Sequence, residues 1–514
     1  MSFDEMTTPP PTRTHPHRAT AMSGSRQRAG RKRWKMTSME LDADHCYEAL
    51  QARDGRFDGV FYAGVTSTGV YCRPVCPSRM PRRHNVCFFA HPAAAEDAGF
   101  RPCKRCRPES APGSAAWDPN GDLLGRALSL IDDGALDGGS VADLAGRLHL
   151  ADRHLRRVFA ERLGTSPLSV ARTRRAHLAR RLLDETGLSV TDVAFAAGFG
   201  SVRQFNDVMR ATFGASPSQL RRSRAGGTTA GTGERRTLTI RLPFRAPLDW
   251  ESTLHVLRLK STPLVEEVAG TSYRRTVPGG WAQVRSGGER HLLLDVAVDD
   301  IRHLTGLVAS ARRLFDLDAD TETVCRALGR DPLLAPVVAR HPGLRLLGAW
   351  DGFETVVRTI IGQLISVRAA STTTGRLCRW LGQEVADAPK GLGRLFVTPD
   401  AVVGEELEAV GMTRAKAGAI RAVAAAVIEG DVLLDGSVGG AHLERAMLAL
   451  PGVGPWTAAL VRMRVGHDPD AFVSGDLGVR RALGGVSAAE AEERSRAWRP
   501  WRAYAAMYLW RTIT

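Results

Sequence analysis

The chain has 514 residues, which is too long for one hydrophobic core, so about three or four domains are expected. Its hydrophobic fraction of 43% and charged fraction of 24% are typical of a globular protein, and no apolar run approaches the roughly 20 residues of a membrane span. The polar, basic start does not resemble a secretory signal, which predicts a cytoplasmic protein with no membrane partner. The net charge of +15 indicates a polyanionic partner, most often nucleic acid.

The first 37 residues combine Pro, Thr and Ser with a basic cluster, RAGRKRWK, that runs from Arg28 to Lys35. They show no apolar periodicity, so the segment 1–37 is predicted to be a disordered basic tail. Two interpretations of the tail stay open, because Met36 and Met39 are alternative starts. It is either a non-specific DNA contact or an extension that the native protein lacks.

Four cysteines lie within 35 positions of the next segment. They form the pattern C-x3-C, then 26 residues, then C-x2-C, and they are Cys72, Cys76, Cys103 and Cys106. Two closely spaced pairs of thiols are typical of a tetrahedral zinc site, whereas disulfides are rare in a reducing cytoplasm. We therefore predict one Zn²⁺ ion bound by these four cysteines, with a redox dithiol or a chance cluster of thiols as the alternatives.

The role of this metal has two interpretations. Zinc can simply hold a small domain together. It also keeps a bound thiolate deprotonated, and therefore nucleophilic, at neutral pH. Basic residues around the cysteines favour contact with a DNA backbone: Arg73, Arg79, Arg82, Arg83, Arg101, Lys104, Arg105 and Arg107. A thiolate held against phosphates can take an alkyl group from them.

The stretches FYAGVTSTGVYCRPVCPSR (61–79) and GFRPCKRC (99–106) resemble the N-terminal domain of the Ada adaptive-response proteins. The resemblance covers about residues 40–110 and implies an Ada-type zinc domain at 38–112. It implies that Cys72 accepts a methyl group from a DNA methylphosphotriester while all four cysteines bind zinc. Methylation replaces a charged thiolate by a neutral thioether, so repulsion from phosphate falls and tighter promoter binding is expected. Nothing in the sequence resets the thioether, so the transfer is expected to be stoichiometric.

An internal repeat follows, because Ser140–Pro167 echoes Ser189–Pro217. Each copy predicts a capped short helix, a tight turn and a second amphipathic helix, with a long helical segment at 166–183 between the copies. Two helix-turn-helix units about 50 residues apart resemble the AraC-type DNA-binding domain, here at 118–221.

The second helix of each unit, Asp152–Leu163 or Ser201–Phe213, is expected to enter the major groove of double-stranded DNA. The candidate DNA-binding side chains on these helices are Arg153, Arg156, Arg203 and Gln204. A helix-turn-helix can also be a mere packing module, but the duplication and the positive charge favour DNA binding.

A Gly/Thr-rich segment at 222–236 is predicted to be a flexible linker. Beyond it, alternating strands are expected at Thr237–Leu242, Gly279–Arg285 and His291–Val298, which predicts a small β-rich domain at 237–320. From about Leu333 to residue 514 the pattern is almost entirely helical.

The helical part contains LPGVGPWTAALVRMRV at 450–465, where one helix ends and another begins near Pro455. Gly452 and Gly454 allow backbone N–H groups to face outward at the start of the second helix, which suits a DNA phosphate. This is a moderately specific helix-hairpin-helix signal. Asp476 lies 22 residues beyond Gly454 and is the candidate catalytic carboxylate.

The segment 237–514 resembles the AlkA 3-methyladenine glycosylases of the helix-hairpin-helix superfamily through APLDW (246–250), RLFDL (313–317), FETVVRTIIGQLISV (353–367) and WRPWRAYAAMYLW (498–510). The resemblance implies that Asp476 is catalytic, that Leu364 fills the gap left by an extruded base, and that Trp456 and Trp510 line the base pocket. Asp476 is alternatively a helix cap, and Leu364 is alternatively a core residue.

Two departures from the pattern refine the expected activity. Leu460 and Leu477 stand where AlkA relatives can carry tyrosine, which affects the range of bases rather than the type of reaction. Trp456 occupies the hairpin position at which related lyases carry lysine, so a monofunctional glycosylase without a cofactor for this step is predicted.

Together the patterns predict a multidomain α+β protein: a small zinc domain, an AraC-type double helix-turn-helix, a β-rich AlkA N-terminal domain and an all-α helix-hairpin-helix glycosylase domain at 321–514. The expected function is a methylation-switched transcription activator fused to an enzyme that excises alkylated bases. The alternative is a zinc-containing regulator with an inactive glycosylase-like half. We expect promoter DNA, alkylated DNA and RNA polymerase as partners of a nucleoid-associated monomer.

Overall fold

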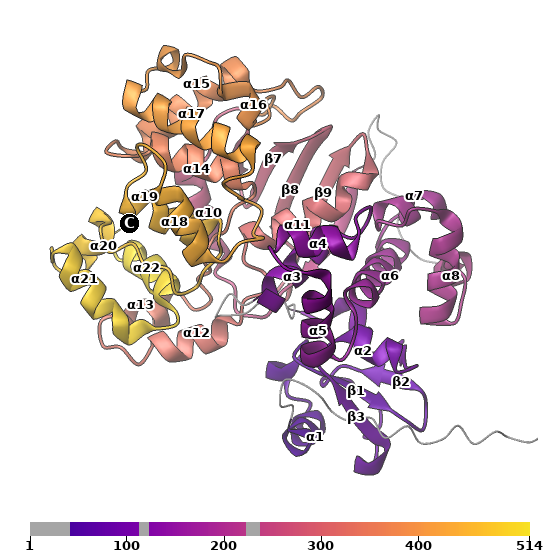
Figure 1. Cartoon of the computed structure of the whole chain (residues 1–514). Coiled ribbons are helices and arrows are strands. Elements are labelled where there is room, and N and C mark those ends of the chain that lie inside the picture. Colours follow the sequence, from indigo (N-terminus) through magenta and orange to yellow (C-terminus); the bar gives the residue numbers. More distant parts are fainter. Residues whose placement is uncertain (1–41, 113–122, 223–236, 514) are drawn as a thin grey trace, which may run out of the picture. The chain divides into compact units, whose positions relative to one another are not determined.

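The computed structural model describes residues 42–112, 123–222 and 237–513 (Figure 1). These residues form a multidomain α+β structure, as the sequence predicts. The predicted tail, and all of the predicted linker except Arg222, lie outside the described residues. None of the helices within those three ranges combines the length and apolar character needed to cross a bilayer.

The first described part holds a four-stranded sheet in the order β3-β1-β2-β4. Strand β1 pairs antiparallel with β2 and β3, whereas β4 runs parallel to β2. The elements are α1 (Ala43–Ala52), β1 (Tyr62–Val65), β2 (Val70–Cys72), β3 (Val86–Phe89), α2 (Pro92–Asp97) and β4 (Arg101–Pro102). The parallel pair brings the segment before Cys103 beside the segment that ends at Cys72.

The second part is helical and contains both predicted repeats. Its helices are α3 (Leu123–Asp132), α4 (Val141–Arg147), α5 (Asp152–Leu163), α6 (Pro167–Glu185), α7 (Val190–Ala196), α8 (Val202–Phe213) and α9 (Pro217–Arg222). Ser140 and Ser189 cap the first helix of each repeat by accepting a backbone N–H, as the patterns predict. Helices α5 and α8 both end at a glycine in the left-handed region, Gly164 and Gly214.

The third part begins with a five-stranded antiparallel sheet in the order β5-β9-β8-β7-β6. Its strands are β5 (Leu238–Pro243), β6 (Glu266–Ala269), β7 (Ser272–Val277), β8 (Gly280–Ser286) and β9 (His291–Val298), with α10 (Trp250–Lys260) between β5 and β6. The segments predicted as strands become β5, β8 and β9. The sequence pattern does not predict β6 and β7, because adjacent charged residues hide the alternation of apolar and polar residues in these strands.

Helices make up the rest of the third part. They are α11 (Leu304–Leu314), α12 (Thr321–Leu328), α13 (Ala335–Arg340), α14 (Gly352–Ile361), α15 (Val367–Leu381), α16 (Pro399–Val402), α17 (Arg414–Glu429), α18 (Gly440–Leu448), α19 (Pro455–Arg464), α20 (Leu477–Ala482), α21 (Ala488–Ser495) and α22 (Arg502–Arg511). The predicted helical hairpin is α18 followed by α19.

A buried ion network joins this sheet to the helical layer. Arg275 on β7 donates to Glu354 on α14 at 2.8 Å, and Arg358 one turn later pairs with Glu354 at 2.9 Å and with Glu266 on β6 at 2.7 Å. Arg275, Glu354 and Glu266 are each at most 4% exposed. Burial favours the neutral form of Glu354, but the two guanidinium groups lower its pKa below the ordinary value. The network therefore remains charged and fixes the sheet against α14.

Replacement of Glu354 by Gln should loosen the contact between β7 and α14. Removing one charge from a buried network typically costs about 3–5 kcal/mol, because the partner charges stay buried. A cost of about 3 kcal/mol corresponds to about 100-fold faster amide exchange of segments that open together. Hydrogen–deuterium exchange of the β7 and α14 peptides in the full chain measures this effect. Glu384→Gln, at a carboxylate that is 76% exposed, is the matched control and should leave both peptides unchanged.

Candidate metal centre and candidate active site

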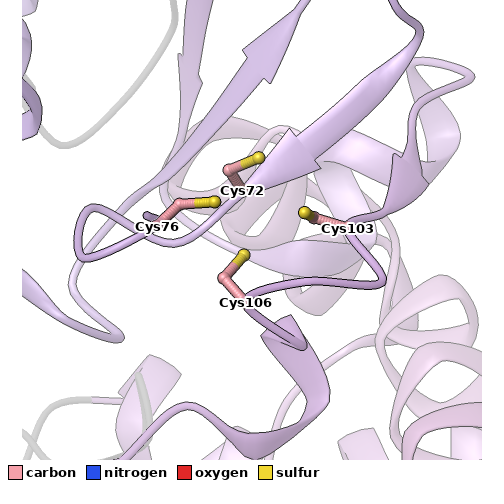
Figure 2. A group of neighbouring side chains, drawn as sticks. All are labelled: Cys72, Cys76, Cys103 and Cys106. Carbon is pink, nitrogen blue, oxygen red and sulfur yellow. The ribbon is translucent and has the colours of Figure 1, made fainter. Parts of the chain in front are cut away.

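The four predicted zinc ligands meet at one point of the first part. Their Sγ atoms all lie within 4.8 Å of one another, and Figure 2 shows the sulfurs turned toward a common centre. Cys72 ends β2, and Cys76 follows in a turn closed by its N–H donating to the Arg73 carbonyl at 3.1 Å. A second turn between Cys103 and Arg107 supplies the other pair.

This sulfur spacing fits zinc. A tetrahedral ion with Zn–S bonds of about 2.3 Å places its sulfurs about 3.8 Å apart. Four thiolates at such distances repel strongly unless a cation lies between them. The cluster is therefore a site for one Zn²⁺, as predicted. Cys46 and Cys87 lie outside the cluster, and burial raises the pKa of each thiol to about 11.

The four ligands differ in exposure. Cys76, Cys103 and Cys106 are buried, whereas Cys72 is only partly buried. The Arg73 backbone N–H lies 3.4 Å from the Cys106 sulfur and donates to it, which stabilises that sulfur as a thiolate. Cys72 is thus the least buried residue of the four ligands.

The basic residues near the centre fall into two groups. The Arg73 guanidinium is held by the buried carboxylate of Asp58, and Arg83 lies over the rings of Tyr47 and Phe88. These two side chains have structural partners. The exposed cations around the cysteines are Arg79, Arg82, Arg101, Lys104 and Arg105.

Both predicted recognition helices present polar side chains to solvent. Arg153 and Arg156 on α5 are exposed, and so are Arg203 and Gln204 on α8. Arg156 also pairs with Asp152 one turn earlier, at 2.7 Å. The faces below these side chains are fully buried through Leu155, Phe159, Phe205 and Met209. The four candidate DNA-binding side chains therefore lie on exposed faces, each opposite a buried apolar face.

In the third part, Asp476 is held by three donors. The indole Nε1–H of Trp510 donates to its Oδ1 at 2.8 Å, and that of Trp456 donates to its Oδ2 at 3.0 Å. The Val479 N–H donates to Oδ1 at 3.0 Å, so Asp476 is also the N-cap of α20. The alternative interpretation as a helix cap is correct without excluding a catalytic role. The two predicted pocket tryptophans therefore also orient the carboxylate.

The glycines of the hairpin have different structural requirements. Gly452 has φ +77, and an added Cβ would lie 2.7 Å from the Ala419 side chain, so the fold itself requires glycine there. Gly454 is the N-cap of α19 with φ −92 and has open space where a Cβ would stand. The backbone at Gly454 is thus open to the close approach of a ligand.

Leu364 stands out in the loop between α14 and α15. It is fully exposed and has a positive φ of +57, which is strained for a leucine. The neighbouring Gln363 donates to the Thr457 hydroxyl at 2.9 Å, which ties this loop to the hairpin helix α19. The alternative interpretation of Leu364 as a core residue is wrong.

A cavity of about 450 Å³ opens beside Asp476, and Trp456, Trp510 and Leu460 are among its lining residues. Its wall also includes two cations that the sequence reading misses, Lys260 at the end of α10 and Arg464 at the end of α19. The sequence offered one indication for Lys260: lysine is rare in this chain, which has only six, so each lysine could have been considered individually. No local pattern marks Arg464, because basic residues are common in the last turn of a helix.

Comparison with known proteins matches three family models to this chain. The metal binding domain of Ada matches residues 45–109, a helix-turn-helix domain matches 144–223, and the AlkA N-terminal domain matches 239–351. Each match falls within one of the described parts, apart from residue 223. The order of the models agrees with the predicted order of domains.

Curated relatives extend this agreement. The probable bifunctional transcriptional activator/DNA repair enzyme AlkA of Mycobacterium tuberculosis (strain ATCC 25618 / H37Rv) is 40% identical over 483 residues, which cover 92% of this chain and 97% of that protein. DNA-3-methyladenine glycosylase 2 of Escherichia coli (strain K12) is 31% identical over 290 residues, 53% of this chain and 96% of that protein. The bifunctional transcriptional activator/DNA repair enzyme AdaA of Bacillus subtilis (strain 168) is 28% identical over 182 residues, 35% of this chain and 84% of that protein. Because the first match spans nearly both proteins, this chain belongs to the family of bifunctional transcriptional activator/DNA repair enzymes of the AlkA type, which joins an Ada-type zinc domain and a helix-turn-helix domain to an AlkA-type domain.

Proposed function

We propose that this protein senses methylated DNA through Cys72, activates transcription in response, and excises alkylated bases by hydrolysis at Asp476. The observation that carries the excision activity is the carboxylate of Asp476, held by two indole N–H groups beside a cavity of about 450 Å³. The family membership and the four-cysteine cluster support the sensing activity.

The methyl transfer is a single displacement. The Cys72 sulfur attacks the methyl carbon of a methylphosphotriester, and an S–C bond forms as the C–O bond breaks. The electron pair stays on the phosphate oxygen, which leaves an ordinary phosphodiester anion. Bound zinc keeps the thiols deprotonated at neutral pH. The partial exposure of Cys72, beside buried Cys76, Cys103 and Cys106, supports its assignment as the acceptor.

The same step is proposed to switch DNA binding. Methylation removes one negative charge from a centre that faces phosphates, which favours binding by roughly 1–3 kcal/mol in a partly desolvated interface. Arg153, Arg156, Arg203 and Gln204 are the proposed contacts of α5 and α8 with the promoter. We further infer that the bound protein acts as a monomer, contacts RNA polymerase and works on DNA in the cytoplasm.

The excision step breaks the bond between the sugar and the base. The bonding electron pair leaves with the base, so positive charge develops on the sugar. The Asp476 carboxylate stabilises this charge and accepts a proton from the water that adds to C1′. Trp456, at the hairpin position where lyases carry lysine, supports a monofunctional reaction.

Three further residues are proposed to hold the damaged strand. Gly452 and Gly454 shape the start of α19, where a phosphate oxygen can accept hydrogen bonds from backbone N–H groups. Leu364, exposed and apolar, is proposed to fill the gap that the extruded base leaves. The base then enters the cavity that Trp456 and Trp510 line.

Exposure of the full chain to methylphosphotriester-containing DNA should add one methyl group to Cys72. Peptide mass spectrometry identifies the modified residue. The Cys72→Ser variant should acquire no methyl group, whereas Cys87→Ser, at a thiol outside the cluster, should behave as wild type. A methyl group found on Cys76, Cys103 or Cys106 would contradict the assignment.

Replacement of Asp476 by Asn should lower excision of 3-methyladenine from duplex DNA by about 100-fold or more, because the developing positive charge loses its counter-charge. Asparagine is a good helix N-cap, so α20 should stay folded. Single-turnover release of the free base measures the effect. Asp431→Asn, at an exposed aspartate of the same part, is the control. Equal release above background by both proteins would contradict the catalytic role of Asp476, and no release by wild type would favour an inactive glycosylase-like half.

Replacement of Leu364 by Ala should lower excision from duplex DNA about tenfold and leave excision from single-stranded DNA nearly unchanged. A single strand has no stacked gap to fill, so the wedge matters only in a duplex. The ratio of the two rates in one preparation measures the effect independently of the active fraction. Leu333→Ala, at a leucine that is 48% exposed, is the control. An equal loss on both substrates would assign Leu364 a structural role.

A further inference from the structure

The cavity beside Asp476 contains an amine in a place where a base is expected. Lys260 Nζ lies 5.6 Å from the centroid of the Trp510 ring, in the geometry of a cation–π contact. The same indole donates its Nε1–H to Asp476. Lys260 therefore lies over the Trp510 ring inside the cavity that Asp476 also lines.

The charges that face Lys260 come from several elements. The charged residues that line the cavity with it are Glu266 (β6), Arg275 (β7), Glu354 and Arg358 (α14), Arg464 (α19), Asp476 at the start of α20, and Arg511 (α22). Helix α15, which packs against α10, contributes only Val367, Ala370, Ser371 and Thr374 to the wall. Arg275 and Arg358 are neutralised by Glu354 and Glu266 within the ion network.

Arg464 differs from the arginines of that network. Its Nε and Nη2 atoms are buried and have no hydrogen-bond partner among the residues that the structure describes. Burial and the neighbouring Arg358 lower its pKa to about 10, so it stays cationic at neutral pH. The cavity thus contains a positive charge that Asp476 alone does not neutralise.

This excess charge acts on Lys260. Arg464, burial and Arg358, in that order, lower the pKa of Lys260 to about 7, and Asp476 opposes them only in part. The amine is therefore poised between its charged and neutral forms near physiological pH.

We propose that Lys260 is a specificity-determining residue of the excision reaction, and that its ammonium form promotes release of neutral modified purines and opposes release of cationic ones. The proposal rests on the excision activity proposed above. It assigns to this cavity a preference that the two tryptophans alone would not produce, since electron-rich rings favour a cationic base.

The chemistry of the leaving base explains the preference. When the bond between C1′ and the base nitrogen breaks, the electron pair stays on the base. A neutral purine would then leave as an anion, so a proton from Lys260 Nζ–H to the departing base is needed for a neutral product. The amine becomes neutral, and the water that adds to C1′ gives its proton to Asp476. A cationic base leaves neutral without a proton, and its approach to Trp510 meets repulsion from Lys260 and Arg464.

The two substrate classes should consequently respond to pH in opposite directions. Below a pH of about 7 Lys260 carries its proton and can donate it to a departing neutral purine. The rate of excision of a neutral purine should therefore fall as the pH rises through that value. Excision of a cationic base should increase over the same interval, because the repelling charge disappears.

The test uses full-length protein and two duplexes, one with 7-methylguanine as the cationic base and one with hypoxanthine as the neutral purine. In single-turnover assays, Lys260→Met should lower hypoxanthine release by about 100-fold, the usual size of a general-acid contribution. It should leave 7-methylguanine release equal or faster, and it should flatten both pH profiles near 7. Lys390→Met, at an exposed lysine of the same part, is the matched control and should match wild type.

The ratio of the two rates within one preparation does not depend on the fraction of folded enzyme. An unchanged ratio in Lys260→Met, with wild type active on both duplexes, would overturn the role of Lys260 and leave the proposed function intact. Wild type inactive on both duplexes would instead refute the proposed function and this inference with it. Lys260→Arg distinguishes the effect of the positive charge from the effect of its titration. Arginine stays charged, so it should slow 7-methylguanine release at every pH tested.

Discussion

The two indole hydrogen bonds to Asp476 are the constraint that organises the C-terminal third of the molecule. Trp456 comes from the second hairpin helix, Trp510 from the last helix, and the carboxylate itself from the start of α20. The three elements must therefore fold together before the carboxylate has a fixed orientation. The same contacts define one wall of the cavity, so the position of the acid and the shape of the pocket are not independent.

The ion network around Arg275 is the second interaction on which the cavity depends. It fixes β6 and β7 against α14, the helix that precedes the loop carrying Leu364. Because the network uses both carboxylates for Arg275 and Arg358, neither acid remains to neutralise Arg464. The charge balance of the cavity is thus a consequence of how the sheet is attached to the helices. A pocket lined by apolar and aromatic groups is in this way also a cationic pocket.

The sequence predicted most of the fold and the cysteine cluster. The cysteine spacing predicted the zinc cluster and the capped repeats predicted α4, α5, α7 and α8, whereas the catalytic role of Asp476, which the resemblance implies, stays a prediction. The sequence did not reveal β6, β7, Lys260 or Arg464. Charged residues usually indicate a solvated surface, and only tertiary pairing shows that Glu266 and Arg275 are buried. The environment of Lys260 likewise depends on elements far apart in the chain.

The two proposed centres solve the same electrostatic problem in different ways. A thiolate and a carboxylate are both anions that must act close to a polyanion, and each therefore needs positive charge nearby. At the zinc centre the charge lies on the surface, in Arg79, Arg82 and Lys104, where it can contact phosphates directly. At Asp476 it lies in the wall of the cavity, in Lys260 and Arg464. In the proposed mechanism, surface cations therefore contribute affinity for any DNA, whereas cations within the cavity discriminate between the bases that enter it.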